Sequence, residues 1–398
     1  MTEEQAGGSK GKATSDHILT LKELIQISKQ KKSKQTYITF LDVTKAYDKA
    51  WLDGIMYVMD KQGIKDETWL LIKELNTNLT AKIKTKDGLT RPITINNSIR
   101  QGGVLSGLQY ALLMDEISKN IKKANLGIQV PNTQTKIGCL LWMDDVALIT
   151  NNREEMQQML DITDTTAKKY HIMFGEEKSK VLKLGKQNQE TQFKLGDIKL
   201  EYTEKYRYLG ITLNHKNNMT EQIKEITGKT EAAFQTILHL ARDKNFKGIG
   251  MEVILKLVEI CIEPIILYSA ETWQLNKKET KELNRILENI IKRILLTPTT
   301  TPREVIYMET GTISTEYMAM EKRIMYKNKL KYQENSLQKT LTEKNIGKGW
   351  TKTTNTMIKE LHIEEDELQE SKNTTKTIVK EKINQTFKTH RNNRKGKT

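Results

Sequence analysis

The chain has 398 residues, of which 65 are Lys or Arg and 50 are Asp or Glu, so its formal net charge at pH 7 is +15. This length is ample for a buried core and suggests two or three domains. Hydrophobic residues make up 37% of the sequence, a low share for a compact globular protein, which predicts thinly packed or extended parts. The excess positive charge points to a polyanion partner, either a nucleic acid or an anionic membrane surface.

The membrane alternative is the weaker one. The most apolar long stretch, residues 251–268, carries too many charges for a spanning helix. These charges are Glu252, Lys256, Glu259 and Glu263. Residues 1–15 are small and polar, so they are no signal peptide and we expect them to be disordered. The two cysteines, Cys139 and Cys261, suffice for neither a zinc knuckle nor a disulfide scaffold. We therefore expect an intracellular protein, in the nucleus or the cytoplasm, with no membrane partner.

The predicted elements mix helices and strands in the first half of the chain and are mostly helical after about residue 219. In chain order they are a short helix at 17–27, a strand at 36–43, helices at 44–63 and 68–78, a hairpin at 81–95, a helix at 106–124, strands at 137–150, a helix at 153–170 and short strands up to 213. We expect an α+β fold. Its expected parts are a disordered N-terminus at 1–15, an α+β region at 16–218, helical regions at 219–300 and 301–370, and a basic tail at 371–398.

Two adjacent carboxylates, Asp144 and Asp145, interrupt the apolar run LLWMDDVALIT at residues 140–150. An apolar run with a two-residue polar centre predicts two buried strands with the pair at a hairpin tip. Neighbouring strand side chains point to opposite faces, so both cannot enter the core. Holding two anions together is costly unless a cation is present. The alternative interpretation is an exposed tip with two solvated carboxylates.

A third carboxylate, Asp42, ends the predicted strand TYITFLD. Three carboxylates at the ends of neighbouring strands would form an oxygen-rich site suited to Mg²⁺. Two such ions about 4 Å apart activate one oxygen and stabilise a leaving phosphate oxygen, which is the chemistry of nucleotidyl transfer. The sequence alone does not show that Asp42 and Asp144 meet.

Several segments resemble those of the reverse transcriptases of non-LTR (LINE-type) retrotransposons. They are FLDVTKAYDKAW (40–51), IRQGGVLSGLQYALLMDEI (99–117), WMDD (142–145), GEEKSKVLKLG (175–185), YRYLGITL (206–213) and LYSAETWQLNKKE (267–279). Their order over roughly residues 16–300 makes the match specific. The resemblance implies a polymerase-type palm with partial fingers at 16–218, followed by a helical thumb at 219–300.

The resemblance also implies an activity, RNA-directed DNA polymerase, which adds deoxynucleotides to a primer 3′-hydroxyl. Asp42, Asp144 and Asp145 would hold two Mg²⁺ ions, with Mn²⁺ as an alternative ion. Lys178 would protonate the leaving pyrophosphate as a general acid, although a surface lysine is an equal alternative. The implied partners are an RNA template, a DNA primer, deoxynucleoside triphosphates and other parts of a retrotransposon polyprotein.

The resemblance assigns binding roles to three further groups of residues. Tyr47 would lie under the incoming sugar and exclude a ribose 2′-hydroxyl by steric clash; the alternative is an aromatic packed on the core. Gln101 and Gly102 would contact the nucleotide, since glycine lets the backbone approach closely, and an ordinary turn is the alternative. The primer grip would be formed by Tyr208, Leu209 and Gly210.

The sequence also departs from the family pattern. Gly107 stands where the family usually has Pro, and Gln109 stands where an apolar residue normally packs. The basic finger motifs that hold the triphosphate, the endonuclease domain and the C-terminal zinc motif are not recognised, so we expect a copy truncated at the fingers with impaired activity. A catalytically weak or inactive nucleic-acid-binding remnant is the alternative function. Candidate phosphate contacts after residue 219 are Lys224, Lys229, Arg242, Lys244 and Lys247.

Overall fold

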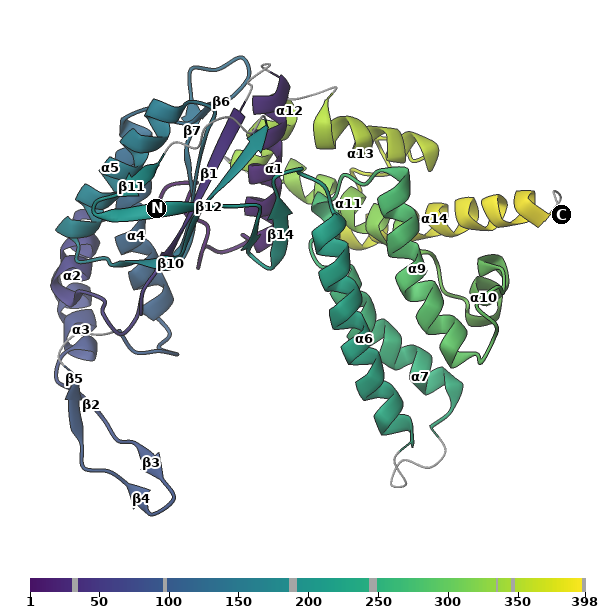
Figure 1. The fold of residues 1–398 in the computed structure, drawn as a ribbon, viewed down its shortest axis with the longest axis horizontal. Coiled ribbons are helices and arrows are strands. Elements are labelled where there is room, and N and C mark those ends of the chain that lie inside the picture. The colour runs from purple at the N-terminus through teal and green to yellow at the C-terminus, as the bar shows by residue number, and fades with distance from the viewer. Residues whose placement is uncertain are drawn as a thin grey trace. The chain divides into compact units, whose positions relative to one another are not determined.

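The computed structural model describes residues 1–30, 35–95, 99–185, 192–242, 249–333, 336–344 and 348–395. The chain divides into two compact units, Met1–Leu209 and Gly210–Thr398, and the division falls before the boundary expected at 218–219. Strands and helices mix in unit 1, whereas unit 2 is almost entirely helical (Figure 1). The expected α+β fold class is therefore confirmed.

Unit 1 is built on a six-stranded sheet with the strand order β11-β12-β10-β1-β9-β8. These strands are β1 (Gln35–Val43), β8 (Cys139–Trp142), β9 (Asp145–Thr150), β10 (Phe174–Gly185), β11 (Phe193–Leu195) and β12 (Ile198–Thr203). Strand β1 pairs antiparallel with both β9 and β10, so it lies inside the sheet. Its run of β-branched and aromatic residues suits a strand covered on both faces.

Helices cover the sheet on both faces. They are α1 (Thr14–Gln30), α2 (Leu52–Lys61), α3 (Asp66–Asn76), α4 (Ser106–Lys123) and α5 (Arg153–Lys169). Tyr37 and Leu41 of β1 share a core cluster with Leu160 of α5 and with residues of α4. Ile38 and Phe40 are buried as well, and strand alternation points them to the opposite face, where α1 contacts β1 and β8 (Figure 1).

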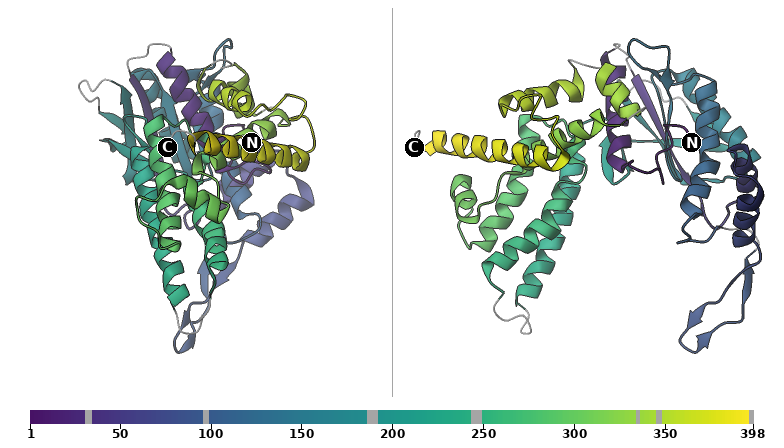
Figure 2. Two further views of the ribbon diagram at one scale, coloured as in Figure 1. Left: turned by 90° about the vertical axis from the view of Figure 1, so that its right-hand side faces the viewer. Right: turned by 180° about the vertical axis from the view of Figure 1, so that it is seen from behind.

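A thin β arm projects from unit 1 away from the sheet, as Figures 1 and 2 show. It contains β2 (Leu79–Ala81), β3 (Lys84–Thr85), β4 (Gly88–Leu89) and β5 (Ile93–Ile95). Strands β3 and β4 pair on either side of a two-residue turn, Lys86-Asp87, and Gly88, which follows the turn, adopts a φ of 122°. The hairpin that the sequence predicted there is therefore confirmed. The remaining short strands of unit 1 are β6 (Ile128–Gln129), β7 (Lys136–Ile137) and β13 (Lys205–Tyr208).

The helix expected at 44–63 begins only at Leu52. Residues 44–49 form turns instead, and Lys45 adopts a left-handed φ of 51°. The Thr44 amide donates to the Met173 carbonyl at 2.8 Å, which keeps the backbone beyond β1 tied to a neighbouring segment. A helix starting at Thr44 is incompatible with this local geometry, so the first eight residues of the prediction were wrong.

The N-terminal segment (residues 1–13) is ordered, which corrects the expected disorder of residues 1–15. Gln5 forms a parallel bridge with Leu141 of the edge strand β8. The Ala6 amide donates to the Leu141 carbonyl at 3.1 Å, and the Leu141 amide donates to the Glu4 carbonyl at 2.8 Å. Glu4, Gln5 and Ala6 are buried. The segment docks through backbone hydrogen bonds to a sheet edge, and this kind of docking leaves no hydrophobic periodicity in the sequence.

Unit 2 contains one strand, β14 (Ile211–Asn214), and a set of helices in its described part. The helices are α6 (Thr220–Arg242), α7 (Met251–Leu257), α8 (Glu263–Ile266), α9 (Lys277–Ile294), α10 (Arg303–Thr310), α11 (Thr315–Lys331), α12 (Leu337–Lys344), α13 (Gly349–Glu360) and α14 (Lys372–Lys395). One buried core cluster contains Phe234 of α6, Leu287 of α9 and, from the segment before α9, Trp273. Across the described residues, no helix has the length and apolar character needed to cross a membrane.

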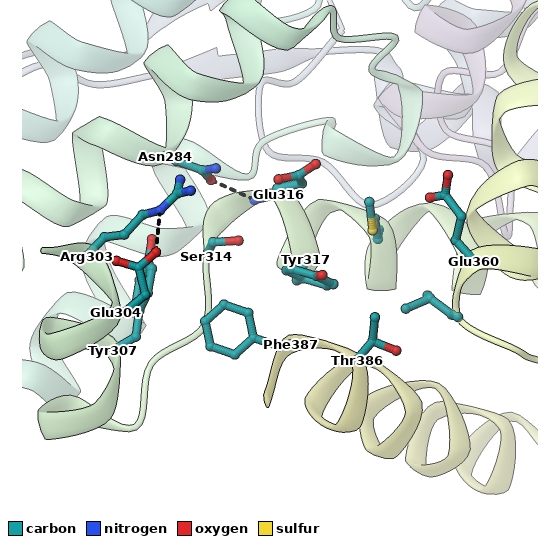
Figure 3. Close-up of a pocket in the computed structure, with 12 residues that line it drawn as sticks. Asn284, Arg303, Glu304, Tyr307, Ser314, Glu316, Tyr317, Glu360, Thr386 and Phe387 are labelled. Atoms are coloured by element: carbon teal, nitrogen blue, oxygen red, sulfur yellow. Dashed lines mark hydrogen bonds and ion pairs between the residues drawn. The ribbon is translucent and has the colours of Figure 1, made fainter. Parts of the chain in front are cut away.

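Within the basic tail expected at 371–398, Lys372–Lys395 form helix α14, which docks onto α11. Val379 and Ile383 are fully buried, and Phe387 follows at the same four-residue spacing, so the three lie on one face of the helix. The Phe387 ring packs edge-on against Tyr307 and Tyr317, with ring centroids 5.4 and 5.3 Å apart. These aromatic residues border a cavity of about 240 Å³ (Figure 3). Three apolar side chains on one face therefore anchor a helix whose other residues are mostly polar.

Candidate active site

The carboxylate pair lies at the tip of the hairpin formed by β8 and β9, as the sequence predicted. Trp142 pairs with Asp145, so Met143 and Asp144 form a two-residue turn between the strands. Met143 adopts a left-handed φ of 58°, a conformation that is strained for a residue other than glycine. Asp144 is thus held in the turn itself, and Asp145 begins β9.

The strand register brings Asp42 to the same end of the sheet. Leu41 of β1 pairs with Val146 of β9, and continuing this register by one residue places Asp42 opposite Asp145. On its other side Asp42 pairs with Gly175 of β10, where the ladder shifts between Phe40 and Asp42. The Asp42 amide donates to the Ser179 hydroxyl at 3.2 Å. The end of β1 is therefore fixed between two neighbouring strands.

The three carboxylates interact electrostatically. Partial burial raises the pKa of Asp145 to about 6, and the charges of Asp144 and Asp42 add to this rise. Burial also raises the pKa of Asp144, and Asp42 contributes in the same direction, whereas Lys178 opposes it. Like charges held this close disfavour each other's ionised form. A cation would relieve that cost.

The chemistry of the three side chains fits a magnesium ion, because carboxylate oxygens are its preferred protein ligands. The Asp42 side chain is 31% exposed, so an ion from solvent can reach it. Within the described residues, however, no three His, Cys, Asp or Glu side chains converge closely enough to form a ready-made metal cage. The three carboxylates are neighbours, and their oxygens are suitable metal ligands. These oxygens do not converge on a single metal position.

Lys178 joins this group from strand β10. Its Nζ lies 3.8 Å from Oδ2 of Asp42, and its side chain is 72% exposed. An ion pair this open to water contributes little to stability. The structure therefore places Lys178 beside the predicted catalytic residues and leaves its ammonium group accessible.

Tyr47 lies near the hairpin tip, beyond the end of β1. Its ring stacks on Tyr110 of α4 with centroids 5.5 Å apart. Burial raises the pKa of Tyr47, and the charge of Asp144 raises it further. Gly107 lies close by, because a Cβ added to it would be 3.2 Å from Met143 Cε and 4.0 Å from the Tyr47 hydroxyl. The glycine that replaces the family's proline thus leaves space for both side chains.

Gln101 and Gly102 lie on an exposed turn that is tied to the Tyr47 segment. The Ile99 amide donates to the Tyr47 carbonyl at 3.0 Å, and Gln101 Nε2 donates to Asp48 Oδ1 at 3.3 Å. Gly102 adopts a φ of 80° with nothing within 4 Å of its added Cβ. The turn is therefore open to solvent and connected to the same site.

The three predicted primer-grip residues span the division between the units. In unit 1, Tyr208 is fully buried and its ring lies 5.2 Å from that of Phe40, so its side chain packs in the core. In unit 2, a Cβ at Gly210 would lie 2.9 Å from the Tyr268 ring, and the φ of 82° also requires glycine. Leu209 has a φ of 45°, which makes this a sharp turn.

Two of the candidate phosphate contacts of unit 2 are paired with carboxylates on their own helix. Lys224 contacts Glu221 at 3.0 Å, and Lys229 contacts Glu225 at 3.9 Å. Both pairs have the spacing of ordinary surface pairs on a helix. The Arg242 side chain, Lys244 and Lys247 lie outside the described residues.

Sequence reasoning missed several residues around the site. Gln5 contacts the hairpin turn through Met143, and Tyr206 stacks on Phe40 with centroids 4.2 Å apart. The alternating aromatics of YRY were a usable signal for Tyr206, since both rings would face one side of a strand. A single glutamine in a short polar segment, such as Gln5, gives no comparable signal.

Comparisons with known proteins point to one enzyme family. The family described as reverse transcriptase (RNA-dependent DNA polymerase) matches residues 1–213. The chain is 21% identical to an RNA-directed DNA polymerase from the mobile element jockey of Drosophila melanogaster, covering 63% of this chain and 27% of the relative. It is 22% identical to a Pol polyprotein of the type-1 retrotransposable element R2 from Popillia japonica, covering 75% of this chain and 42% of the relative.

The similarity to solved structures is lower. A telomerase from Candida tropicalis, solved in complex with a fragment of telomeric RNA, has a TM-score of 0.41 and 14% identity over 90% of this chain and 53% of that one. The chain spans less than half the length of the curated relatives it matches. Because the family match covers more than half of the chain and includes every predicted carboxylate, the chain belongs to the reverse transcriptase (RNA-dependent DNA polymerase) family, among the non-LTR retrotransposon members.

Proposed function

We propose that this chain is an RNA-directed DNA polymerase that extends a primer 3′-hydroxyl with deoxynucleotides. The observation that carries the proposal is that β1 pairs with β9 up to Leu41 and Val146, so that the next residues, Asp42 and Asp145, lie at the end of the sheet where the hairpin tip holds Asp144. Membership of the reverse transcriptase family supports assigning this carboxylate group to nucleotidyl transfer.

Asp42, Asp144 and Asp145 would hold two Mg²⁺ ions, or Mn²⁺ in their place. When bound, the ions would lower the cost of charge on the attacking and leaving oxygens. The carboxylates themselves must be ionised to bind a metal. The raised pKa of Asp145, about 6, still leaves it mainly ionised at neutral pH.

Two other residues would act on the nucleotide. Lys178, exposed beside Asp42, would carry the proton that the departing pyrophosphate accepts. Tyr47 is held by its stack on Tyr110, and its rigid ring would reject a 2′-hydroxyl on the incoming sugar. Gln101 and Gly102 would contact the nucleotide from the open turn.

The proposed partners are an RNA template, a DNA primer and deoxynucleoside triphosphates. The jockey relative is named an RNA-directed DNA polymerase, which supports an RNA template. The R2 relatives are named Pol polyproteins, which supports other parts of such a polyprotein as partners. The formal charge of +15 suits binding to phosphate backbones, and such binding should weaken as salt rises.

The test is primer extension on a primed RNA template with deoxynucleotides and Mg²⁺. The matched control carries Asp144→Ala and Asp145→Ala. Extension by the unmodified chain and not by the control supports the proposal. Salt-sensitive template binding without extension supports the alternative, a nucleic-acid-binding remnant. Absence of both extension and binding contradicts both functions.

A further inference from the structure

Gln5 connects the N-terminal segment to the hairpin that carries the carboxylates. Its side chain is buried, with only 1% of the residue exposed. Its Oε1 accepts from the Met143 amide at 3.2 Å and from the Gly7 amide at 2.9 Å. Met143 is the residue directly before Asp144, so Gln5 bonds to the backbone of the turn itself.

The opposite end of the Gln5 amide faces two carbonyl groups. Nε2 lies 3.5 Å from the carbonyl of Met143 and 3.5 Å from that of Ala111 in α4. These distances are long for hydrogen bonds, so the two bonds accepted by Oε1 carry most of the attachment. The buried Gln5 amide thus contacts the turn, the N-terminal segment and α4. Its oxygen accepts from two backbone amides, and its NH₂ group faces two backbone carbonyl oxygens.

The turn needs such support because its backbone is strained. Met143 has a φ of 58°, a conformation that is strained for a residue other than glycine and persists only where the surroundings hold it. Gly7 lets the N-terminal segment approach the turn closely, since a Cβ there would lie 2.3 Å from the Met143 amide nitrogen. Gly8 lies against the Met143 side chain, where an added Cβ would be 3.0 Å from Cε.

We propose that Gln5 is a positioning residue that fixes the Met143–Asp144 turn and thereby places Asp144 and Asp145 toward Asp42. The proposal rests on the proposed polymerase function for its catalytic consequence, while the structural attachment stands on the contacts alone. The amide is suited to the task because it offers an acceptor to the Met143 N–H and donors to carbonyl groups without adding charge. A carboxylate in its place would add a negative charge near Asp144 and lose both donors.

The informative variants are Gln5→Met and Gln5→Glu. Methionine keeps similar volume and removes the hydrogen bonds, whereas glutamate keeps the acceptor and adds charge. The matched control is Thr2→Val. The Thr2 hydroxyl anchors the same segment through Asp115 at 2.5 Å and Ser118 at 2.9 Å, both in α4 rather than in the turn.

The first measurement is hydrogen exchange of the full chain, followed by mass spectrometry of peptides covering residues 139–150. Gln5→Met should speed exchange there by about tenfold, the factor expected when a contact worth about 1.4 kcal/mol is lost. Thr2→Val should change it much less. Unchanged exchange in Gln5→Met would overturn the proposal. Equal acceleration in Thr2→Val, or acceleration that extends equally to residues 153–169, would also overturn it, because the effect would then be general loosening.

The second measurement is primer extension by the same proteins. Gln5→Met should lower kcat by about 10- to 100-fold, since a small misplacement of a catalytic group costs this much. The KM for deoxynucleotide and the affinity for template should stay within about twofold. Gln5→Glu should lower kcat at least as far.

The two measurements separate failure of this inference from failure of the proposed function. If the unmodified chain extends no primer, the polymerase proposal fails, and hydrogen exchange still decides whether Gln5 holds the turn. If Gln5→Met exchanges faster but extends primer at the unmodified rate, the attachment is real and its positioning role is refuted.

Discussion

The Nζ atom of Lys178 in β10 lies 3.8 Å from Oδ2 of Asp42, the carboxylate near the C-terminal end of β1. The two strands are neighbours in the sheet, and Asp42 pairs with Gly175 three residues before the lysine. The contact links an exposed ammonium group to a partly exposed carboxylate. It gives the proposed general acid a defined position next to the proposed metal ligands.

The first prediction concerns this lysine. Lys178→Gln should lower kcat for primer extension by about 10²- to 10⁴-fold, the usual contribution of a general acid, while template binding changes little. Lys180→Gln is the matched control, because Lys180 lies on the same strand but pairs with Glu201 at 2.7 Å. Single-turnover kinetics would measure the effect. Equal losses in both variants would show that only surface charge matters.

The second prediction concerns the three carboxylates. Asp42→Asn, Asp144→Asn and Asp145→Asn should each reduce extension by about 10³-fold or more, because each removes an anionic ligand from a site whose work is charge stabilisation. Each variant should keep its affinity for a primed RNA template, measured by fluorescence anisotropy. Retained extension in any one of them would remove that residue from the metal site.

The third prediction concerns pH and metal binding. Asp145 has a pKa raised to about 6 by partial burial and by its two carboxylate neighbours, and a metal binds only its ionised form. The apparent affinity for Mg²⁺ should therefore weaken by about fourfold as pH falls from 7.5 to 5.5, because the ionised fraction of a group with a pKa of about 6 falls by that factor. A Mg²⁺ titration of extension at several pH values measures this. A Mg²⁺ affinity that is flat with pH would contradict the assignment.

The fourth prediction concerns stability without metal. Because the folded pKa of Asp145 lies above its ordinary value of 3.8, the folded state binds this proton more tightly than the unfolded state. The contribution of this group to the free energy of unfolding is therefore largest below about pH 4 and falls as pH rises through about 6. Asp145→Asn should stabilise the chain at pH 7.5, by no more than about 1 kcal/mol because water screens the exposed residue.

Thermal unfolding in EDTA at pH 5 and 7.5 would measure this change. The control is Asp53→Asn, on the exposed surface of α2. An Asp145→Asn variant that is less stable than the unmodified chain at pH 7.5 would show that the carboxylate is favourably paired in the folded state.

The fifth prediction concerns Tyr47 and the sugar. Tyr47→Ala should raise incorporation of ribonucleotides relative to deoxynucleotides by about 10- to 100-fold, since one steric clash is worth that much selectivity. Tyr47→Phe keeps the ring stacked on Tyr110 and should leave the ratio unchanged. Extension with each class of nucleotide gives the ratio. Equal selectivity in Tyr47→Ala and Tyr47→Phe would assign Tyr47 to packing alone.

The sequence alone determined the main elements of unit 1 and the identity of the carboxylates. Helices α4 and α5 and the Asp87-Gly88 hairpin follow from local periodicity and turn chemistry, which depend on neighbours in the chain. The apolar run around Asp144 and Asp145 likewise predicted a hairpin from local sequence alone. The resemblance to non-LTR reverse transcriptases was also readable, because each motif is a short contiguous string.

Only the tertiary structure decided which separate segments meet. The pairing of β1 with β9 runs to Leu41 and Val146 and so brings Asp42 to the end of the sheet that holds Asp145, and strand pairing between distant residues is not encoded in either strand alone. The N-terminal segment and α14 were misjudged because their composition is polar, yet backbone bonds to β8 hold the first and three spaced apolar residues hold the second. Both segments are ordered because they contact residues far away in the chain, and the local sequence does not reveal which residues those are.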